Sequence, residues 1–421
     1  MTTSPANGHT ASQVQRVYLL LTLLTTLAAS FIWGVNTLFL LDAGLSNTEA
    51  FAANAFFSVG MVLFEVPTGV VADTRGRRFS FMLGAGTLLV STLLYLVMWQ
   101  IEAPFIGWAL ASILLGLGFT FFSGATEAWL VDALSATGYE GNLETVFGRG
   151  QTIAGVAMLS GSVLGGIVAQ LTTLGVPYVL RAILLGVALL AAFWFMRDLG
   201  FKPKTDVSTR EALSEITRGS IDGGLRNRPV RWMMLGAPVS GGSGFYAVYA
   251  VQPSRLALSG DPIAYSIAGL GAAIVAGAQI VGGLSVPIVR RFFSLRTNAI
   301  FLAVALESII LVGIAIVGFN MDDLGMTAFY LAIALLVAWA LVAAIAGPIR
   351  QAFLNGVIPS EQRATVLSFD SLMSSLGGVV AQPALGRVAD MSGYAASYMV
   401  SGVVSALALP FIFMAKREHA P

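Results

Sequence analysis

Long apolar stretches of about 20 to 25 residues, separated by short polar breaks, run through almost the whole chain. The hydrocarbon core of a bilayer is about 30 Å thick, so a helix needs about 20 apolar residues to cross it. Hydrophobic residues make up 56% of the chain and charged residues only 11%, whereas a soluble domain carries roughly 25% charged residues. The sequence therefore predicts an all-α integral membrane protein.

The polar breaks predict twelve membrane-spanning helices, and 421 residues leave room for them with short loops. Helices are required because a backbone in lipid must satisfy its own hydrogen bonds, and the alternating pattern of a membrane β-barrel is absent. The expected spans are 17–41, 48–71, 79–100, 105–134, 147–171, 178–197, 230–254, 263–288, 297–318, 326–353, 363–389 and 395–415.

The basic residues predict how these spans are oriented. If the N-terminus is cytoplasmic, all of the 23 Lys and Arg fall in cytoplasmic loops and tails except Arg181, Arg255 and Arg387. Basic residues concentrate on the cytoplasmic side of membrane proteins. No small-residue cleavage site follows the first apolar run, which we interpret as a retained helix. We expect a multi-pass protein of the cell membrane, a bacterial inner or plasma membrane, with both termini cytoplasmic.

A repeated segment indicates that the chain is a duplication. Leu-Gly-Gly-Ile-Val-Ala-Gln at 164–170 recurs as Leu-Gly-Gly-Val-Val-Ala-Gln at 376–382, a shift of 212 residues. Two weaker matches have nearly the same shift: Gly282 with Arg290 and Arg291 repeats Gly69 with Arg77 and Arg78, and Arg363 repeats Arg149. Such a repeat predicts two six-helix bundles with a binding site between them.

This duplication divides the chain into five parts. We expect a cytoplasmic tail at 1–16, the first bundle at 17–197, a cytoplasmic linker at 198–229, the second bundle at 230–415 and a second tail at 416–421. In the linker, Ser208-Thr-Arg-Glu211 has capping-box spacing before an apolar pair and predicts a short surface helix. A solvated linker explains the same residues equally well.

Several function classes have no support in the sequence. We find no phosphate-binding glycine loop, nucleophile elbow or His-Glu zinc motif, and no cysteine. The two histidines, His9 and His419, lie in the tails. We therefore expect no enzyme, no cofactor and no bound metal. The net charge is +1 and the basic residues are spread over the loops, so nucleic acid is not an expected partner.

The turn between the second and third spans carries the strongest motif. Gly69-Val-Val-Ala-Asp-Thr-Arg-Gly-Arg-Arg78 resembles the G-x-x-x-D-x-x-G-R-R/K signature of the major facilitator superfamily, and the resemblance in layout covers the whole chain. It implies a cytoplasmic latch between the halves that holds the outward-facing state. The latch residues would be Gly69, Asp73, Gly76, Arg77 and Arg78, with Asp132 paired to Arg149 or to the cluster at Arg75. The alternative is a topology anchor only.

Shorter segments are most similar to the drug/proton antiporter branch of that family and its sugar-efflux relatives. They are Glu65-Val-Pro-Thr-Gly69, Ala125-Thr-Glu-Ala-Trp-Leu-Val-Asp132 and Tyr249-Ala-Val-Gln-Pro253. Two positions depart from family patterns. Ser162 replaces the proline of the G-P-x-x-G-G antiporter motif, and Ser112 replaces an intramembrane arginine often linked to proton transfer.

Acidic residues within the apolar spans are candidates for proton coupling, because a charge near mid-bilayer costs about 2.5–3.5 kcal/mol. Glu65 is the principal candidate, and a structural hydrogen bond to a neighbouring helix is its alternative. Glu127 is the second. Asp370 either joins the latch of the other half or lines the cavity.

Aromatic and amide side chains on the expected cavity helices describe the substrate as amphipathic or weakly polar. The candidates are Trp33, Asn36, Phe121, Phe122, Tyr246, Tyr249, Gln252, Gln279 and Trp339. We therefore expect a monomeric secondary transporter whose partners are a small-molecule substrate, protons and the lipid bilayer, exporting drug-like or sugar-like compounds by alternating access. The alternatives are a proton symporter or uniporter for a small nutrient or metabolite, and a non-transporting receptor or assembly factor.

Overall fold

The computed structural model describes residues 10–203, 224–259, 264–358 and 363–418, and within these ranges it is built from helices without a strand. The first group of helices precedes residue 200. It consists of α1 (Ala11–Trp33), α2 (Asn36–Asp42), α3 (Asn47–Arg75), α4 (Arg77–Gln100), α5 (Phe105–Thr120), α6 (Ala125–Ala136), α7 (Leu143–Leu171) and α8 (Gly175–Phe195). The surface helix expected at Ser208–Glu211 lies outside the described residues.

The second group follows residue 227. It consists of α10 (Arg228–Ser259), α11 (Tyr265–Arg290), α12 (Arg296–Phe319), α13 (Met321–Leu324), α14 (Met326–Val357), α15 (Arg363–Ala406) and α16 (Leu409–Arg417). Within the described part of the chain, ten helical segments are long and apolar enough to cross a membrane. The chain is therefore a multi-pass membrane protein.

Two interruptions differ from the expected spans, and a third agrees with them. The expectation of one helix over 17–41 is wrong, because α1 ends at Trp33 and α2 begins at Asn36. The span expected at 105–134 is divided into α5 and α6 at Gly124, whose φ of 66° is left-handed. The last two spans meet at Gly393, whose φ of 79° is not helical, so the chain breaks between 389 and 395 as expected. Glycine adopts such φ values without the steric cost of a Cβ, so the last two turns occur where the sequence supplies one.

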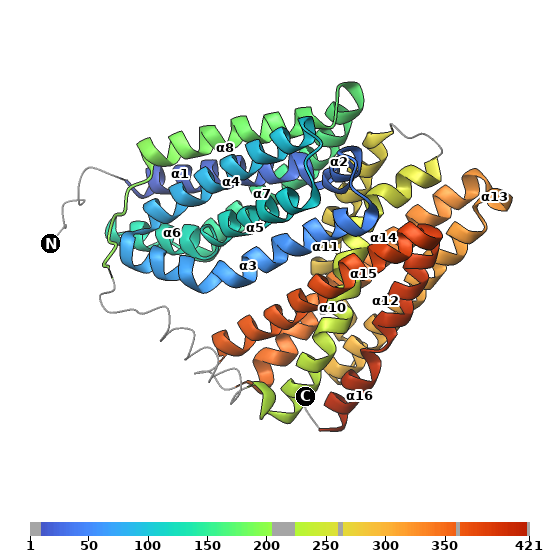
Figure 1. Ribbon diagram of the computed structural model, residues 1–421. Coiled ribbons are helices and arrows are strands. Elements are labelled where there is room, and N and C mark those ends of the chain that lie inside the picture. Colours follow the sequence, from blue (N-terminus) through green and yellow to red (C-terminus); the bar gives the residue numbers. More distant parts are fainter. Residues whose placement is uncertain (1–9, 204–223, 260–263, 359–362, 419–421) are drawn as a thin grey trace.

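Helices of each group pack mainly on one another, as Figure 1 shows. In the first group α1 lies against α7 and α8, and α4 against α5 and α8; in the second, α15 lies against α10 and α12. The two groups meet along two helix pairs, α3 with α15 and α7 with α11. A site between the groups would therefore lie beside these two helix pairs.

The repeated segment packs in the same way in both groups. A Cβ at Gly165 of α7 would collide with the carbonyl oxygen of Phe31 in α1, and a Cβ at Gly377 of α15 would collide with that of Pro238 in α10. In each copy the first glycine thus allows its helix, α7 or α15, to approach the first long helix of its own group, α1 or α10. Small residues at a contact are how helix backbones come together in a membrane.

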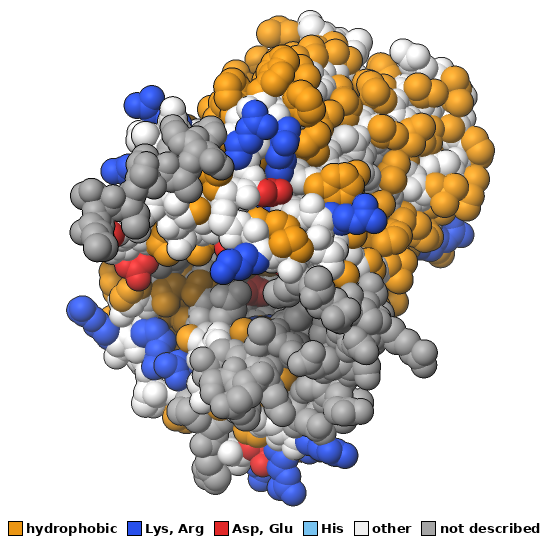
Figure 2. All heavy atoms as spheres, turned by 90° about the vertical axis from the view of Figure 1, so that its left-hand side faces the viewer, with side chains coloured by type: hydrophobic (Ala, Val, Ile, Leu, Met, Phe, Trp, Pro, Cys, Tyr) orange, Lys and Arg blue, Asp and Glu red, His pale blue; other side chains and the backbone are white. Residues whose placement is uncertain are grey.

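The outer surface is divided into a polar end and apolar flanks. Viewed from the end that carries the N-terminus, Lys and Arg side chains gather over the helix ends, while hydrophobic side chains cover the flank (Figure 2). Basic residues lie in the last turns of α3, α11 and α16. Large apolar side chains such as Leu284, Val380 and Ile309 are exposed, which suits a surface that contacts lipid.

We expect Gly377→Ala to lower the free energy of unfolding by about 1–3 kcal/mol, because the added methyl group overpacks the contact between α15 and α10. The control is Gly86→Ala in α4, where nothing lies within 4 Å of the added Cβ. The control should be neutral or slightly stabilising, since alanine favours helices over glycine by about 1 kcal/mol. Unfolding in detergent followed by circular dichroism measures both, and equal stabilities would contradict the packing described here.

Candidate functional site

A cavity of about 180 Å³ lies among the helices of the first group. It is lined by α1, α2, α3, α4, α5, α7 and α8, and by Tyr249 of α10 from the second group. Its walls are largely apolar and aromatic, with Trp33, Phe57 and Phe119 among the lining residues. The rings of Trp33 and Tyr249 lie 6.4 Å apart across the boundary between the groups. A second cavity of about 280 Å³ shares Ala29, Phe119, Met158 and Arg181 with the first.

A chain of polar side chains forms part of the cavity wall. The hydroxyl of Tyr178 donates to Oδ1 of Asn36 over 2.7 Å, and Nδ2 of Asn36 donates to Oδ1 of Asn54 over 2.8 Å. Asn36 was expected at the site, whereas Asn54 was not. Asn54 is buried and lies on the same face of α3 as Phe57, which the residue spacing of a helix would have indicated.

Arg181 is the main residue that sequence reasoning misplaced. It was counted with the outside loops, yet it lies six residues into α8 and only 2% of it is exposed. Its Nε donates to Oγ1 of Thr92 over 3.0 Å, and Nη1 donates to the carbonyl oxygen of Ala28 over 3.5 Å. The sequence signal for this buried position was a lone arginine within an apolar run. Assigning every basic residue to a loop obscured this signal.

The other predicted substrate residues divide between the cavities and the protein interior. Trp33, Asn36, Tyr249 and Phe122 line the two cavities. Phe121 does not line them: it is buried, and its carbonyl oxygen accepts from the hydroxyl of Ser80. Both phenylalanines follow the end of α5 at Thr120, so the expected continuous helix did not determine which of the two reaches the cavity.

Residues predicted on the second group lie mostly away from these cavities. Tyr246 and Trp339 pack in the apolar core of that group, where the ring of Tyr246 lies 4.9 Å from that of Phe51. Gln279 of α11 is exposed. The expectation that all three surround one chamber with Trp33 is not met by the described cavities, because α10 is the helix of the second group that reaches them.

Hydrogen bonds join the two groups at the end of the molecule opposite the α3–α4 turn. Gln252 donates through Nε2 to the carbonyl oxygen of Trp33 and accepts from the backbone N–H of Thr37, both over 2.8 Å. Asp390 of α15 accepts from the backbone N–H groups of Asn47 and Thr48, both over 2.9 Å. A carboxylate is favourable at a helix N-terminus, here that of α3. Polar contacts therefore close this end of the boundary.

The predicted latch residues form contacts within the first group. Arg77 lies 2.5 Å from Asp73 through Nη1 and Oδ1, and its Nε lies 3.9 Å from Oδ2 of Asp132. Asp132 thus approaches the arginine cluster at Arg75, the second of the two alternatives, through Arg77. Gly69 is exposed, and Gly76 has a φ of 109° at the turn into α4.

Asp198 completes this turn and was absent from the predicted site. Its Oδ1 accepts from the backbone N–H of Arg78 over 2.8 Å, so it caps α4 from beyond the end of α8. Burial raises the pKa of the Asp198 carboxyl, and the N–H of Arg78 and the guanidinium groups of Arg77 and Arg78 oppose this rise. No local sequence pattern connects Asp198 to a helix that begins more than a hundred residues earlier.

Two of the acidic candidates, Glu65 and Glu127, are exposed, although both lie within the expected apolar spans. Glu65 accepts at Oε1 from the hydroxyl of Ser123 over 2.6 Å. Glu127 lies in the first turn of α6 and is also exposed. The two groups contact each other at the start of α3, around Asn47 and Phe51, so Glu65 farther along that helix has an open face.

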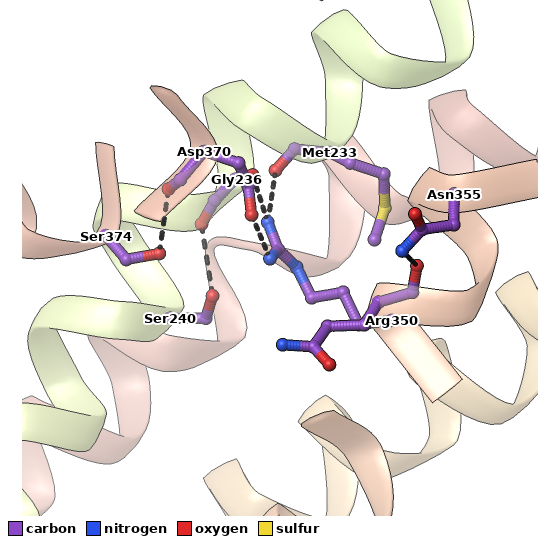
Figure 3. Close-up of polar contacts among 8 residues, drawn as sticks. Met233, Gly236, Ser240, Arg350, Asn355, Asp370 and Ser374 are labelled. Carbon is purple, nitrogen blue, oxygen red and sulfur yellow. Dashed lines mark hydrogen bonds and ion pairs between the residues drawn. The ribbon is translucent and has the colours of Figure 1, made fainter. Parts of the chain in front are cut away.

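Asp370 forms a double interaction with Arg350, shown in Figure 3. Nη2 of Arg350 donates to Oδ1 over 2.6 Å, and Nη1 donates to Oδ2. Arg350 comes from α14 and Asp370 from α15, and the carbonyl oxygen of Met233 in α10 also accepts from Nη2 over 3.4 Å. Asp370 is buried, so the pair ties three helices of the second group together.

Comparison with known proteins identifies this architecture. The family model of the Major Facilitator Superfamily matches residues 18–321. The chain belongs to the Major Facilitator Superfamily. A relative in Methanocaldococcus jannaschii, described as an uncharacterized MFS-type transporter, is 21% identical over 391 residues, which are 91% of this chain and 93% of the relative. This superfamily member is therefore a transporter and not an enzyme.

Solved transporter structures share the fold of this superfamily member at low sequence identity. The nucleoside transporter NupG superposes with a TM-score of 0.75 at 11% identity, covering 98% of this chain and 99% of that one. An auto-inhibited POT family peptide transporter has a TM-score of 0.72 at 13% identity, covering 96% and 97%. A D-xylose-proton symporter has a TM-score of 0.63 at 16% identity, covering 96% of each chain.

We expect Asp370→Asn to destabilise this transporter by about 1–3 kcal/mol, because it leaves the partly buried Arg350 guanidinium without its counter-charge. The double variant Asp370→Asn with Arg350→Gln should recover most of that loss, since neither charge remains to be desolvated. Thermal unfolding in detergent measures all three proteins. A double variant less stable than Asp370→Asn would contradict a coupled buried pair.

Proposed function

We propose that this chain is a secondary active transporter that works by alternating access and exports amphipathic small molecules, drug-like or sugar-like, in exchange for protons. The observation that carries the proposal is the cavity among the helices of the first group, which Tyr249 of the second group also lines, together with the hydrogen bonds of Gln252 and Asp390 that close the far end of the boundary between the groups. Apolar and aromatic walls with few polar groups suit a substrate that is partly apolar.

The proposed membrane topology is twelve spans in two six-helix bundles, 17–197 and 230–415, with a linker at 198–229 and cytoplasmic tails at 1–16 and 416–421. The 52-residue apolar segment Val366–Arg417 supports two of these spans, because it is about twice the length that one crossing requires and turns at Gly393. The repeated glycine contacts of α7 and α15 support the symmetry of the halves. The basic helix ends on the side of the N-terminus support a cytoplasmic location for that side, in the cell membrane.

In the proposed mechanism, the two ends of the boundary between the helix groups close alternately. In the described state the far end is held by hydrogen bonds between the groups, and the α3–α4 turn makes its ion pairs within the first group. In the opposite state the residues Gly69, Asp73, Gly76, Arg77 and Arg78, with Asp132 and Arg149 nearby, would latch the cytoplasmic end. The free energy for export would come from protons, since one charge crossing 100 mV supplies about 2.3 kcal/mol.

Glu65 is the best supported of the three proposed coupling groups. It lies on α3, which lines the boundary, and Ser123 offers its carboxylate one hydrogen bond that a protonated form can also make. Asp370 has less support as a coupling group, because both of its carboxylate oxygens are engaged by Arg350. Glu127 also has less support, because it is exposed on a short helix of the first group.

We expect Glu65→Gln to transport substrate down its gradient but to lose concentrative export driven by a pH gradient, because the amide cannot bind and release a proton. Counterflow and pH-driven uptake into proteoliposomes, with a screen of amphipathic compounds, measure the two activities. Glu127→Gln is the matched control and should retain the larger part of the coupling. An unaltered pH dependence in Glu65→Gln would remove this residue from the mechanism, and uptake that follows the proton gradient inward would favour a symporter.

The chain contains no native cysteine, which allows a direct test of alternating access. We expect Thr48→Cys with Asp390→Cys to be joined by a short bifunctional thiol reagent, and the cross-linked protein to lose at least about nine-tenths of its transport, because the far end can no longer open. Asp42→Cys with Trp99→Cys is the control pair, since these residues are hydrogen-bonded within the first group. Transport that survives complete cross-linking between Thr48→Cys and Asp390→Cys would contradict the mechanism.

A further inference from the structure

Arg181 has hydrogen-bonding capacity that the protein does not use. A guanidinium group carries five N–H donors. Nε is taken by Thr92 and Nη1 by the carbonyl oxygen of Ala28, but Nη2 has no acceptor among the residues that the structure describes. The side chain is almost fully buried and lines both cavities. A buried donor without an acceptor is costly, so this nitrogen requires a partner that is not part of the fold.

Asn54 presents a second unused donor to the same cavity. Its Oδ1 accepts from Asn36, whereas its Nδ2 has no acceptor in the described part of the chain. The residue is 4% exposed. The two unpartnered buried groups on this wall are therefore both N–H donors. A neutral amphipathic substrate would need only scattered donors and acceptors. A wall with two free donors fits a group that is rich in acceptors.

The charge of Arg181 points to the same kind of group. No carboxylate of the described residues lies within ion-pair distance of its guanidinium, which has the ring of Phe119 at 5.9 Å and otherwise neutral partners. A buried charge normally has a counter-charge, because desolvation without one is unfavourable. The two hydrogen bonds to Thr92 and Ala28 hold the side chain in place, but a neutral donor would serve that purpose equally well.

We propose that Arg181 and Asn54 bind the anionic group of the transported substrate, which is an organic anion with a carboxylate or similar acidic group on an apolar body. The acidic group accepts from Nη2 of Arg181 and from Nδ2 of Asn54, and the apolar body lies against Trp33, Phe119 and Tyr249. Tyr249 belongs to the second group, so an anion held by α8 and α3 contacts both groups at once. The inference rests on the proposed transport function and specifies its substrate class.

The test compares an acid with its amide, a pair that differs in charge and hardly in shape. Phenylbutyrate and phenylbutyramide, both radiolabelled, are measured for equilibrium binding to the purified full-length protein and for uptake into proteoliposomes. We expect the wild-type protein to bind the acid at least about tenfold more tightly than the amide, a factor equal to about 1.4 kcal/mol. Arg181→Gln should reduce this preference to near unity, and Arg181→Lys should keep part of it, because lysine retains the charge without the planar fork.

The matched control is Arg291→Gln, which removes one positive charge from an exposed arginine at the end of α11. This control should bind both probes as the wild-type protein does. Equal binding of acid and amide by the wild-type protein, or binding of neither, overturns the assignment without depending on the folding of any variant. A preference that persists in a monodisperse Arg181→Gln protein overturns the role of Arg181.

The transport function has a separate readout in the same experiment. Uptake of acid and amide at equal rates would leave a transporter in place and remove the anion preference. Preferential binding of the acid without uptake by wild-type proteoliposomes would support the anion site and contradict transport of this substrate class. The two proposals can therefore fail independently.

Discussion

A polar group inside a bilayer has to find its partner within the protein, because the hydrocarbon offers neither donors nor acceptors. This constraint explains why the described chain is built from helices. Two polar contacts show how side chains meet it. The Asp370–Arg350 pair ties α14 to α15, and Gln252 exchanges two hydrogen bonds with the opposite group.

The same constraint makes the exceptions informative. Arg181 and Asn54 each keep an unpartnered donor on the wall of one cavity, although the rest of the polar chain from Tyr178 to Asn36 is satisfied. In a soluble protein an ordered water could occupy such a place at little cost. Within an apolar cavity between membrane helices, a substrate that supplies acceptors is the partner for which these donors are placed.

The two ends of the boundary between the helix groups are built from different chemistry. The far end uses short polar side chains and a helix N-terminus, with Asp390 accepting from the start of α3. The end near the N-terminus carries guanidinium groups whose ion pairs lie within the first group. Under the proposed alternating access, the far end would open by moving α3 away from α15 in a rocking motion of the two groups.

Local sequence determined much of this protein. Apolar length predicted an all-helical membrane protein, the glycine repeat indicated a duplication whose two copies make similar contacts, and the Gly69–Arg78 turn indicated the superfamily that the family comparison confirmed. These features are local, because length, small residues and turn residues act through their immediate neighbours. Tertiary structure decided the rest. Asp198 caps a helix more than a hundred residues away, Asp390 caps one in the other group, and Arg181 faces a cavity instead of an outer loop. Which side of a helix meets a neighbour, a cavity or lipid depends on how separate helices pack, and all of these environments favour the same apolar residues.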